Sequence, residues 1–156
     1  MQRRQLRVMV LDTSPTSRTI LVVILRREGH RVVCFGDPLE ALRFLSRHGP
    51  ADLLFLGLDL PGMDGLAVLK YVKREPSLRQ TVPIVLLEEE DGVLPRILAR
   101  LAGAKHVVTK PLVRQQIVAL VSEILMRLGS AVMGEQGAAI TSEQTAEAAS
   151  GREAVE

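Results

Sequence analysis

The sequence predicts an α/β fold: a doubly wound parallel sheet of five strands, in the order 2-1-3-4-5, packed between helices. Strand-like and helix-like segments alternate five times along the chain, which is typical of a sheet covered by helices on both faces. The strand-like segments are continuous apolar runs, as expected for strands that are buried on both sides. Right-handed crossovers restrict the possible topologies, and 2-1-3-4-5 is a common order for such sheets.

The five predicted strands are short apolar segments. They are rich in Val, Leu and Ile, and branched side chains pack well on a pleated surface. We expect strands at residues 7–11, 31–35, 52–58, 82–87 and 106–109.

Capping residues mark the starts of the predicted helices. Ser14-Pro15 and Asp37-Pro38 each place a capping side chain before a proline in the first turn. Asp64 is a third N-cap. Apolar residues at steps of three and four then continue each helix. We expect helices from Ser14 to about Glu28, from Asp37 to Gly49, from Asp64 past Val72, from about Leu94 to Gly103, and at residues 112–128.

Length and composition indicate one globular domain. The chain has 156 residues, of which 47% are hydrophobic, enough to bury a single core. No segment approaches the roughly 18 apolar residues that a membrane-spanning helix needs. The single cysteine, Cys34, lies in an apolar run where we expect it to be buried. One cysteine permits no disulfide within the chain, which suits a reducing compartment. We therefore expect a cytoplasmic protein that does not bind membranes.

Residues 129–156 differ from residues 1–128 in composition and charge. The first 128 residues carry 19 basic and 13 acidic residues, a net +6, whereas the rest carry one Arg and five Glu, a net −4. The later segment is rich in Ala, Gly, Ser, Thr, Gln and Glu, so it cannot bury enough apolar surface to offset the entropy of ordering. We expect a folded domain at 1–128 and a disordered tail at 129–156. The alternative for the tail is a short helix at 141–149 that orders on a partner.

Three motifs follow the first, third and fifth predicted strands. They read Val-Leu-Asp-Thr-Ser-Pro at 10–15, Leu-Pro-Gly-Met-Asp-Gly at 60–65 and Thr-Lys-Pro at 109–111. Together with the alternating pattern, residues 7–125 resemble the receiver domain of response regulators, the CheY-like module of two-component signalling. The resemblance implies a flavodoxin-like fold, a cis proline at Pro111, and a site at the carboxyl ends of the strands.

The resemblance also implies a phosphoryl-accepting site, and this chain departs from it. In that family an aspartate four residues before the turn proline accepts the phosphoryl group, two acids hold Mg²⁺, and a hydroxyl and a lysine contact the phosphoryl oxygens. Asp12, Lys110 and Pro111 are retained, but the chain has Thr13 at the second acidic position, Gly57 at the acceptor, Glu88 at the hydroxyl and Val107 at an aromatic position. Glycine has no side chain to phosphorylate. We therefore expect a degenerate pseudo-receiver that is not an enzyme, needs no cofactor, and binds Mg²⁺ at most weakly through Asp12.

Two acidic residues are candidate partners for Lys110, which has no phosphate to bind in a pseudo-receiver. A buried ammonium is costly unless it is paired, so we expect Asp12, Glu88 or both to pair with it. The alternative is that Lys110 extends to water. Asp59 is the rival acceptor on the same strand face as Gly57, but two further residues of strand place it about 6.6 Å away, where transfer geometry is poor. Its simpler interpretation is an exposed loop carboxylate.

Three functions remain open from the sequence. The first is a phosphorylation-independent protein-interaction module in two-component-type signalling, whose partner is a kinase, an output protein or a second copy of the chain. The resemblance implies that the partner face is formed by the fourth helix, fifth strand and fifth helix, with Arg96, Arg100, His106, Val107 and Arg114. The second is a phosphorelay receiver that uses Asp59 and Mg²⁺. The third is nucleic-acid binding, ranked last because the arginines are scattered and no aromatic stacking platform is visible.

Overall fold

The computed structural model describes residues 4–138, and the chain divides into two compact units after Val118. The unit Met1–Val118 contains one parallel sheet of five strands in the order β2-β1-β3-β4-β5, which confirms the predicted fold class and topology. The strands are β1 (Arg7–Leu11), β2 (Arg31–Phe35), β3 (Leu53–Gly57), β4 (Val82–Leu87) and β5 (His106–Thr109). Each agrees with the prediction to within one residue at either end.

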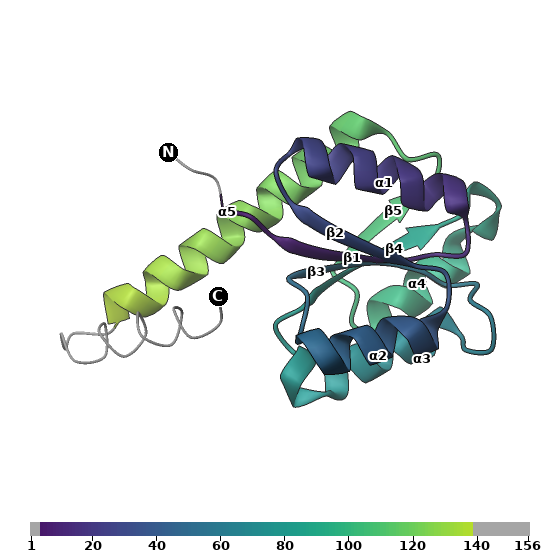
Figure 1. Ribbon diagram of the computed structural model, residues 1–156, viewed down its shortest axis with the longest axis horizontal. Helices are drawn as coiled ribbons and strands as arrows, with labels where there is room; N and C mark the ends of the chain where they lie inside the picture. Colours follow the sequence, from purple (N-terminus) through teal and green to yellow (C-terminus); the bar gives the residue numbers. More distant parts are fainter. Residues whose placement is uncertain (1–3, 139–156) are drawn as a thin grey trace. The chain divides into compact units, whose positions relative to one another are not determined.

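Helices connect the strands and cover the sheet. Helix α1 lies on one face, and α2, α3 and α4 lie on the other (Figure 1). The helices are α1 (Pro15–Arg27), α2 (Pro38–His48), α3 (Gly65–Arg74), α4 (Val93–Leu101) and α5 (Arg114–Ala138). Two short 3-10 turns, at Pro76–Leu78 and Glu89–Asp91, were not among the predicted elements. None of the described helices is long and apolar enough to cross a membrane.

The three predicted N-caps are confirmed. The Ser14 hydroxyl accepts a hydrogen bond from the Ser17 amide at 3.2 Å. The carboxylate of Asp37 accepts from the Leu39 amide at 2.9 Å, and that of Asp64 accepts from the Leu66 amide at 2.9 Å. Each cap satisfies an amide that has no carbonyl partner inside its own helix. Local sequence therefore determines where α1, α2 and α3 begin.

A buried cluster joins the sheet to α2, α3 and α4. Alternate residues of the central strands pack against small and branched residues of the three helices; they include Met9, Leu11, Leu54, Leu56, Val85, Leu87, Ala41, Val68, Leu69, Val72 and Ala99. Cys34, expected in the core, is only partly buried. The reason is its position on β2, because β2 is an edge strand of the sheet.

Helix α5 is longer than predicted. It continues to Ala138 instead of ending at Leu128. No proline interrupts residues 129–138, and most of them are compatible with a helix. Residues 139–156 lie outside the described residues. The predicted disorder beyond Ala138, the helix at 141–149 and the domain boundary at 128 therefore stay predictions, whereas residues 129–138 continue helix α5.

Helix α4 exposes its apolar face. Leu94 and Leu101 are 64% and 79% exposed, and Val93, Ile97 and Leu98 are exposed as well. Ala99 is the buried residue of this helix. The spacing of the apolar residues correctly predicted a helix, but these side chains do not pack into the core. An amphipathic helix with its apolar side toward water is unusual for a monomer.

Candidate functional site

The carboxyl ends of four strands bring the predicted site residues to one edge of the sheet. Asp12 follows β1, Gly57 ends β3, Glu88 follows β4 and Lys110 follows β5. The parallel register aligns these strand ends, since Leu56 pairs with Leu11 and Val85, and Leu87 pairs with Thr109. In doubly wound sheets ligand sites lie at this edge. The predicted topology implies this gathering of the four strand ends, while their role as a site stays a prediction.

Lys110 pairs with both predicted carboxylates. Its Nζ lies 2.9 Å from Asp12 Oδ2 and 2.7 Å from Glu88 Oε1. The side chains of Asp12 and Lys110 are 3% and 12% exposed, whereas that of Glu88 is 48% exposed. The pairing hypothesis is confirmed, and the alternative in which Lys110 simply extends to water is wrong. The contact with Asp12 is the more buried of the two, so losing it is expected to lower the free energy of unfolding more than losing the contact with Glu88.

Asp12 is held from two sides. Its Oδ1 accepts a hydrogen bond from the Ser14 amide at 2.8 Å. Its Oδ2 makes the ion pair with Lys110, but no aligned hydrogen bond to that atom is found among the described residues. The backbone carbonyl of Asp12 accepts from the Arg18 guanidinium at 2.7 Å. The Asp12 carboxylate is therefore fixed in position, and the charge of Lys110 is its main compensation.

Gly57 lies directly against the Asp12 carboxylate. A Cβ atom built on Gly57 would approach Asp12 Cγ and Oδ2 to 3.1 Å each, closer than ordinary van der Waals contact. A side chain at this position would therefore require the Asp12 carboxylate to move by a few tenths of an ångström. Glycine has no Cβ and avoids that movement.

The surroundings of Lys110 determine its protonation. Burial on its own would lower the pKa of Lys110. The hydrogen bond to Glu88, the contact with Asp12 and the charges of both carboxylates outweigh burial and raise the pKa of Lys110 above its ordinary value. Lys110 is therefore a permanent cation at neutral pH.

The residues at this edge do not fit a Mg²⁺ site. Mg²⁺ prefers several oxygen ligands with octahedral geometry. Asp12 is already neutralised by Lys110, and Thr13 stands where a second acid would be, with its hydroxyl donating to the Asp59 carbonyl at 3.3 Å. Within residues 4–129 no group of three or more His, Cys, Asp or Glu side chains could hold a metal ion.

Asp12, Gly57, Glu88 and Lys110 form one group of contacting residues, which we call the lysine cluster. Asp59 is not part of it. Its side chain is exposed, and among the described residues the ion pairs of Lys110 are those with Asp12 and Glu88. Pro111 follows Lys110 through a cis peptide bond, as the family resemblance implied. The structure thus assembles Asp12, Gly57, Glu88 and Lys110, and leaves Asp59 outside.

The residues predicted to form the partner face differ in their exposure and in their contacts. An Arg96 nitrogen donates to the Thr109 hydroxyl at 2.7 Å, so this side chain is directed inward. Arg114 lies 3.7 Å from a Glu28 oxygen. Arg100 is exposed, while His106 and Val107 are partly buried. The sequence reasoning chose four polar residues and Val107 for this surface, and it did not include the exposed apolar residues of α4. The signal was present as five large apolar residues in a helix of nine.

Comparisons with known proteins agree with this fold. Residues 8–122 match the family model described as "Response regulator receiver domain". The "DNA-binding response regulator MtrA" of Mycolicibacterium smegmatis is 33% identical over 121 residues, which cover 78% of this chain and 51% of that protein. The "Transcriptional regulatory protein AruR" of Pseudomonas aeruginosa is 32% identical over 126 residues, with coverages of 78% and 50%. The chain therefore spans about half the length of these curated relatives.

Solved structures show the same fold. The signal receiver domain of a signal transduction histidine kinase from Syntrophus aciditrophicus has a TM-score of 0.67 at 29% identity, covering 76% of this chain and 89% of that chain. The chemotaxis protein CheY4 of Vibrio cholerae has a TM-score of 0.69 at 20% identity, with coverages of 77% and 98%. At that identity the second likeness concerns the fold alone.

Removing the lysine tests the buried ion pair. Lys110→Met leaves the Asp12 carboxylate buried and unpaired, so we expect the free energy of unfolding to fall by roughly 3–5 kcal/mol, measured by urea denaturation. Adding Asp12→Asn should recover much of the loss, because the amide carries no charge. Lys105→Met, at an exposed lysine, is the matched control and should change stability by less than about 0.5 kcal/mol. Equal losses in Lys110→Met and Lys105→Met would contradict the assignment.

The same pair predicts a dependence on pH. Because the pKa of Lys110 is raised in the folded state, its contribution to stability is fully present below the ordinary lysine pKa of about 10.4 and is lost as pH rises through the raised value. We expect the stability difference between wild type and Lys110→Met to shrink above about pH 10.4. Urea midpoints of both proteins across this range measure it, and a difference that does not narrow as pH rises above this value would contradict the assignment to Lys110.

Proposed function

We propose a phosphorylation-independent binding role, from the premise that this chain belongs to the response regulator receiver domain family of two-component signalling. The observation that carries the proposal is the Asp12–Lys110 ion pair packed against Gly57. The resemblance to this family implies that Lys110 would contact a phosphoryl group carried by the residue at position 57. Here it is committed to carboxylates of its own chain, so the site is a structural contact rather than a reactive one.

The binding surface in this proposal is helix α4 with the neighbouring end of β5. The exposed Leu94, Ile97 and Leu101 provide apolar area for burial, and Arg100 lies exposed beside them. Interfaces combine an apolar centre with a polar rim, and Arg is enriched there. A kinase, an output protein or a second copy of this chain is the proposed partner.

The activities of whole relatives do not transfer directly. MtrA is described as DNA-binding, but the match covers 51% of that protein. Within this chain the arginines of residues 4–138 are spread over several elements, and nucleic-acid binding stays the lowest-ranked alternative. We place the protein in the cytoplasm as part of the proposal.

A phosphodonor test separates this role from phosphorylation at Asp59. We expect no mass increase when the protein is incubated with a small acyl phosphate and Mg²⁺ and then weighed intact, because neither residue 57 nor Asp59 combines a carboxylate with the Lys110 charge. A single phosphoryl adduct that disappears in Asp59→Asn would establish the shifted receiver instead. A typical phosphorylatable receiver domain treated in parallel shows that the donor is active.

Substitutions on α4 test the proposed surface. We expect Leu94→Ser combined with Leu101→Ser to abolish partner binding or self-association, measured by cross-linking and light scattering, because burial of a leucine side chain contributes about 1.5–3 kcal/mol. The control is Leu39→Ser on α2, which is exposed to a similar degree but lies outside the surface. A loss of association in the control, with the α4 variant still competent, would move the interface elsewhere.

A further inference from the structure

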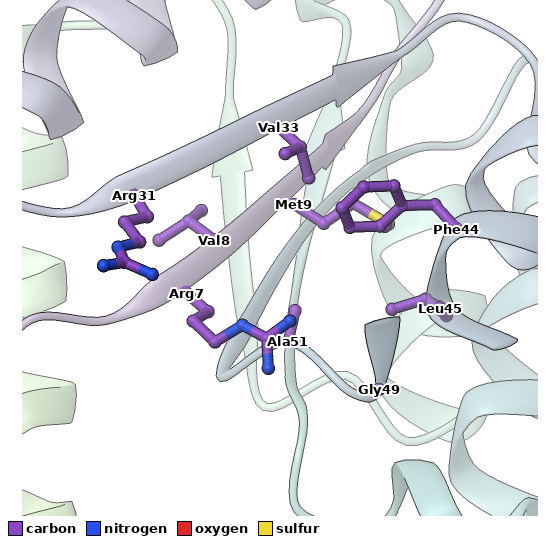
Figure 2. Close-up of a pocket in the computed structure, with 9 residues that line it drawn as sticks. All are labelled: Arg7, Val8, Met9, Arg31, Val33, Phe44, Leu45, Gly49 and Ala51. Atoms are coloured by element: carbon purple, nitrogen blue, oxygen red, sulfur yellow. The ribbon is translucent and has the colours of Figure 1, made fainter. Parts of the chain in front are cut away.

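A second candidate site lies at the opposite ends of the strands from Lys110. A cavity of about 190 Å³ opens where β1 and β2 begin, beneath the second half of α2. Figure 2 shows the residues that line it: Arg7, Val8, Met9, Arg31, Val33, Phe44, Leu45, Gly49 and Ala51. None of them belongs to the lysine cluster or to α4, so the functions discussed so far make no use of this cavity.

The inner part of the cavity is apolar. Met9 is buried, and Val33, Phe44 and Leu45 are partly buried around it. These side chains gather toward one side of the cavity (Figure 2). An engineered apolar cavity of about 150 Å³ accepts a benzene molecule, so this volume fits one ring or a short aliphatic chain. The lining therefore selects an apolar group of about six carbon atoms.

Two arginines lie at the other side of the cavity. Arg7 and Arg31 are direct partners in the parallel register of β1 and β2, and neighbouring strands lie only about 4.8 Å apart. Like charges so close repel each other. Their side chains extend in different directions from these adjacent positions (Figure 2). An anion between them would relieve this repulsion.

The charges around the cavity leave Arg31 available. Arg7 donates one hydrogen bond to the His48 carbonyl at 2.8 Å. The nearby acid, Asp52, accepts from the Arg7 amide at 2.8 Å and lies 3.4 Å from the Arg4 guanidinium. Arg31 is exposed, and its side chain has no hydrogen bond or ion pair within the described part of the chain, although its backbone amide donates to the Leu6 carbonyl at 2.9 Å. The Asp52 carboxylate is thus paired with the Arg7 amide and the Arg4 guanidinium. The edge of the cavity therefore has a net positive charge.

We propose that this cavity binds a small organic carboxylate that carries one ring or a short aliphatic chain. A guanidinium presents paired N–H donors that match a carboxylate, and charge-assisted hydrogen bonds of this kind are the stronger ones. Arg31 binds the carboxylate, Arg7 adds positive charge, and the apolar group packs against Met9 and Phe44. The proposal does not rest on the loss of phosphorylation, and its test is separate.

Benzoate is the probe, and the full chain is titrated with it by two-dimensional amide NMR. We expect saturable shifts of the Val8, Val33 and Gly49 amides. Benzyl alcohol keeps the ring without the charge, and acetate keeps the charge without the ring, so each should bind at least about tenfold more weakly than benzoate. Arg31→Gln should also weaken benzoate about tenfold. The side chain of Arg31 is exposed, so this variant is expected to fold normally.

Arg47→Gln is the matched control. It removes the same charge from an exposed position of α2 that does not line the cavity, and it should leave benzoate affinity unchanged. Three results would overturn the proposal. They are the absence of saturable shifts at the cavity amides, equal binding of benzoate and benzyl alcohol, and equal weakening by Arg47→Gln and Arg31→Gln. The last result would indicate general attraction to a basic surface rather than a site.

Discussion

The need to compensate one buried carboxylate organises the functional edge of this sheet. Asp12 is almost fully buried, and a buried charge is tolerated only when it is paired and hydrogen-bonded. Lys110 supplies the opposite charge and the Ser14 amide supplies a hydrogen bond. Glu88 adds a second, more exposed contact to the lysine. The ends of β1, β4 and β5 are thereby joined by electrostatics at the place where receiver domains are expected to do chemistry.

The lysine cluster and helix α4 both contact the end of β5, at the neighbouring residues Thr109 and Lys110. Thr109 accepts a hydrogen bond from Arg96 of α4, and the next residue is Lys110. Arg96 and Ala99 therefore lie on the inner side of α4, and the leucines lie on the outer side. The orientation of α4 and the closed ion pair depend on the same short segment of backbone. In the proposed binding role, this arrangement would present α4 without a phosphoryl signal.

Much of the fold could be predicted because its signals are local or topological. Capping by Ser14, Asp37 and Asp64 depends on residues that are close in the sequence, and apolar strands joined by helices allow few sheet topologies. The ion pair of Lys110 was also predictable, since a buried ammonium restricts the options. The exposure of the apolar side of α4 was not predictable. The spacing of apolar residues shows that a helix has an apolar and a polar side, but it does not show which side packs against the core. The Arg7–Arg31 cavity was missed for a related reason: it depends on strand register, which no single segment encodes.

The tight fit of Asp12 against Gly57 couples the two positions. A side chain at position 57 would require the Asp12 carboxylate to shift by a few tenths of an ångström, which would change its distance from Lys110. A change at Asp12 alone would leave the lysine with only its exposed partner. The effects of substitutions at positions 12 and 57 on stability are therefore expected to be non-additive, as is usual for residues in direct contact.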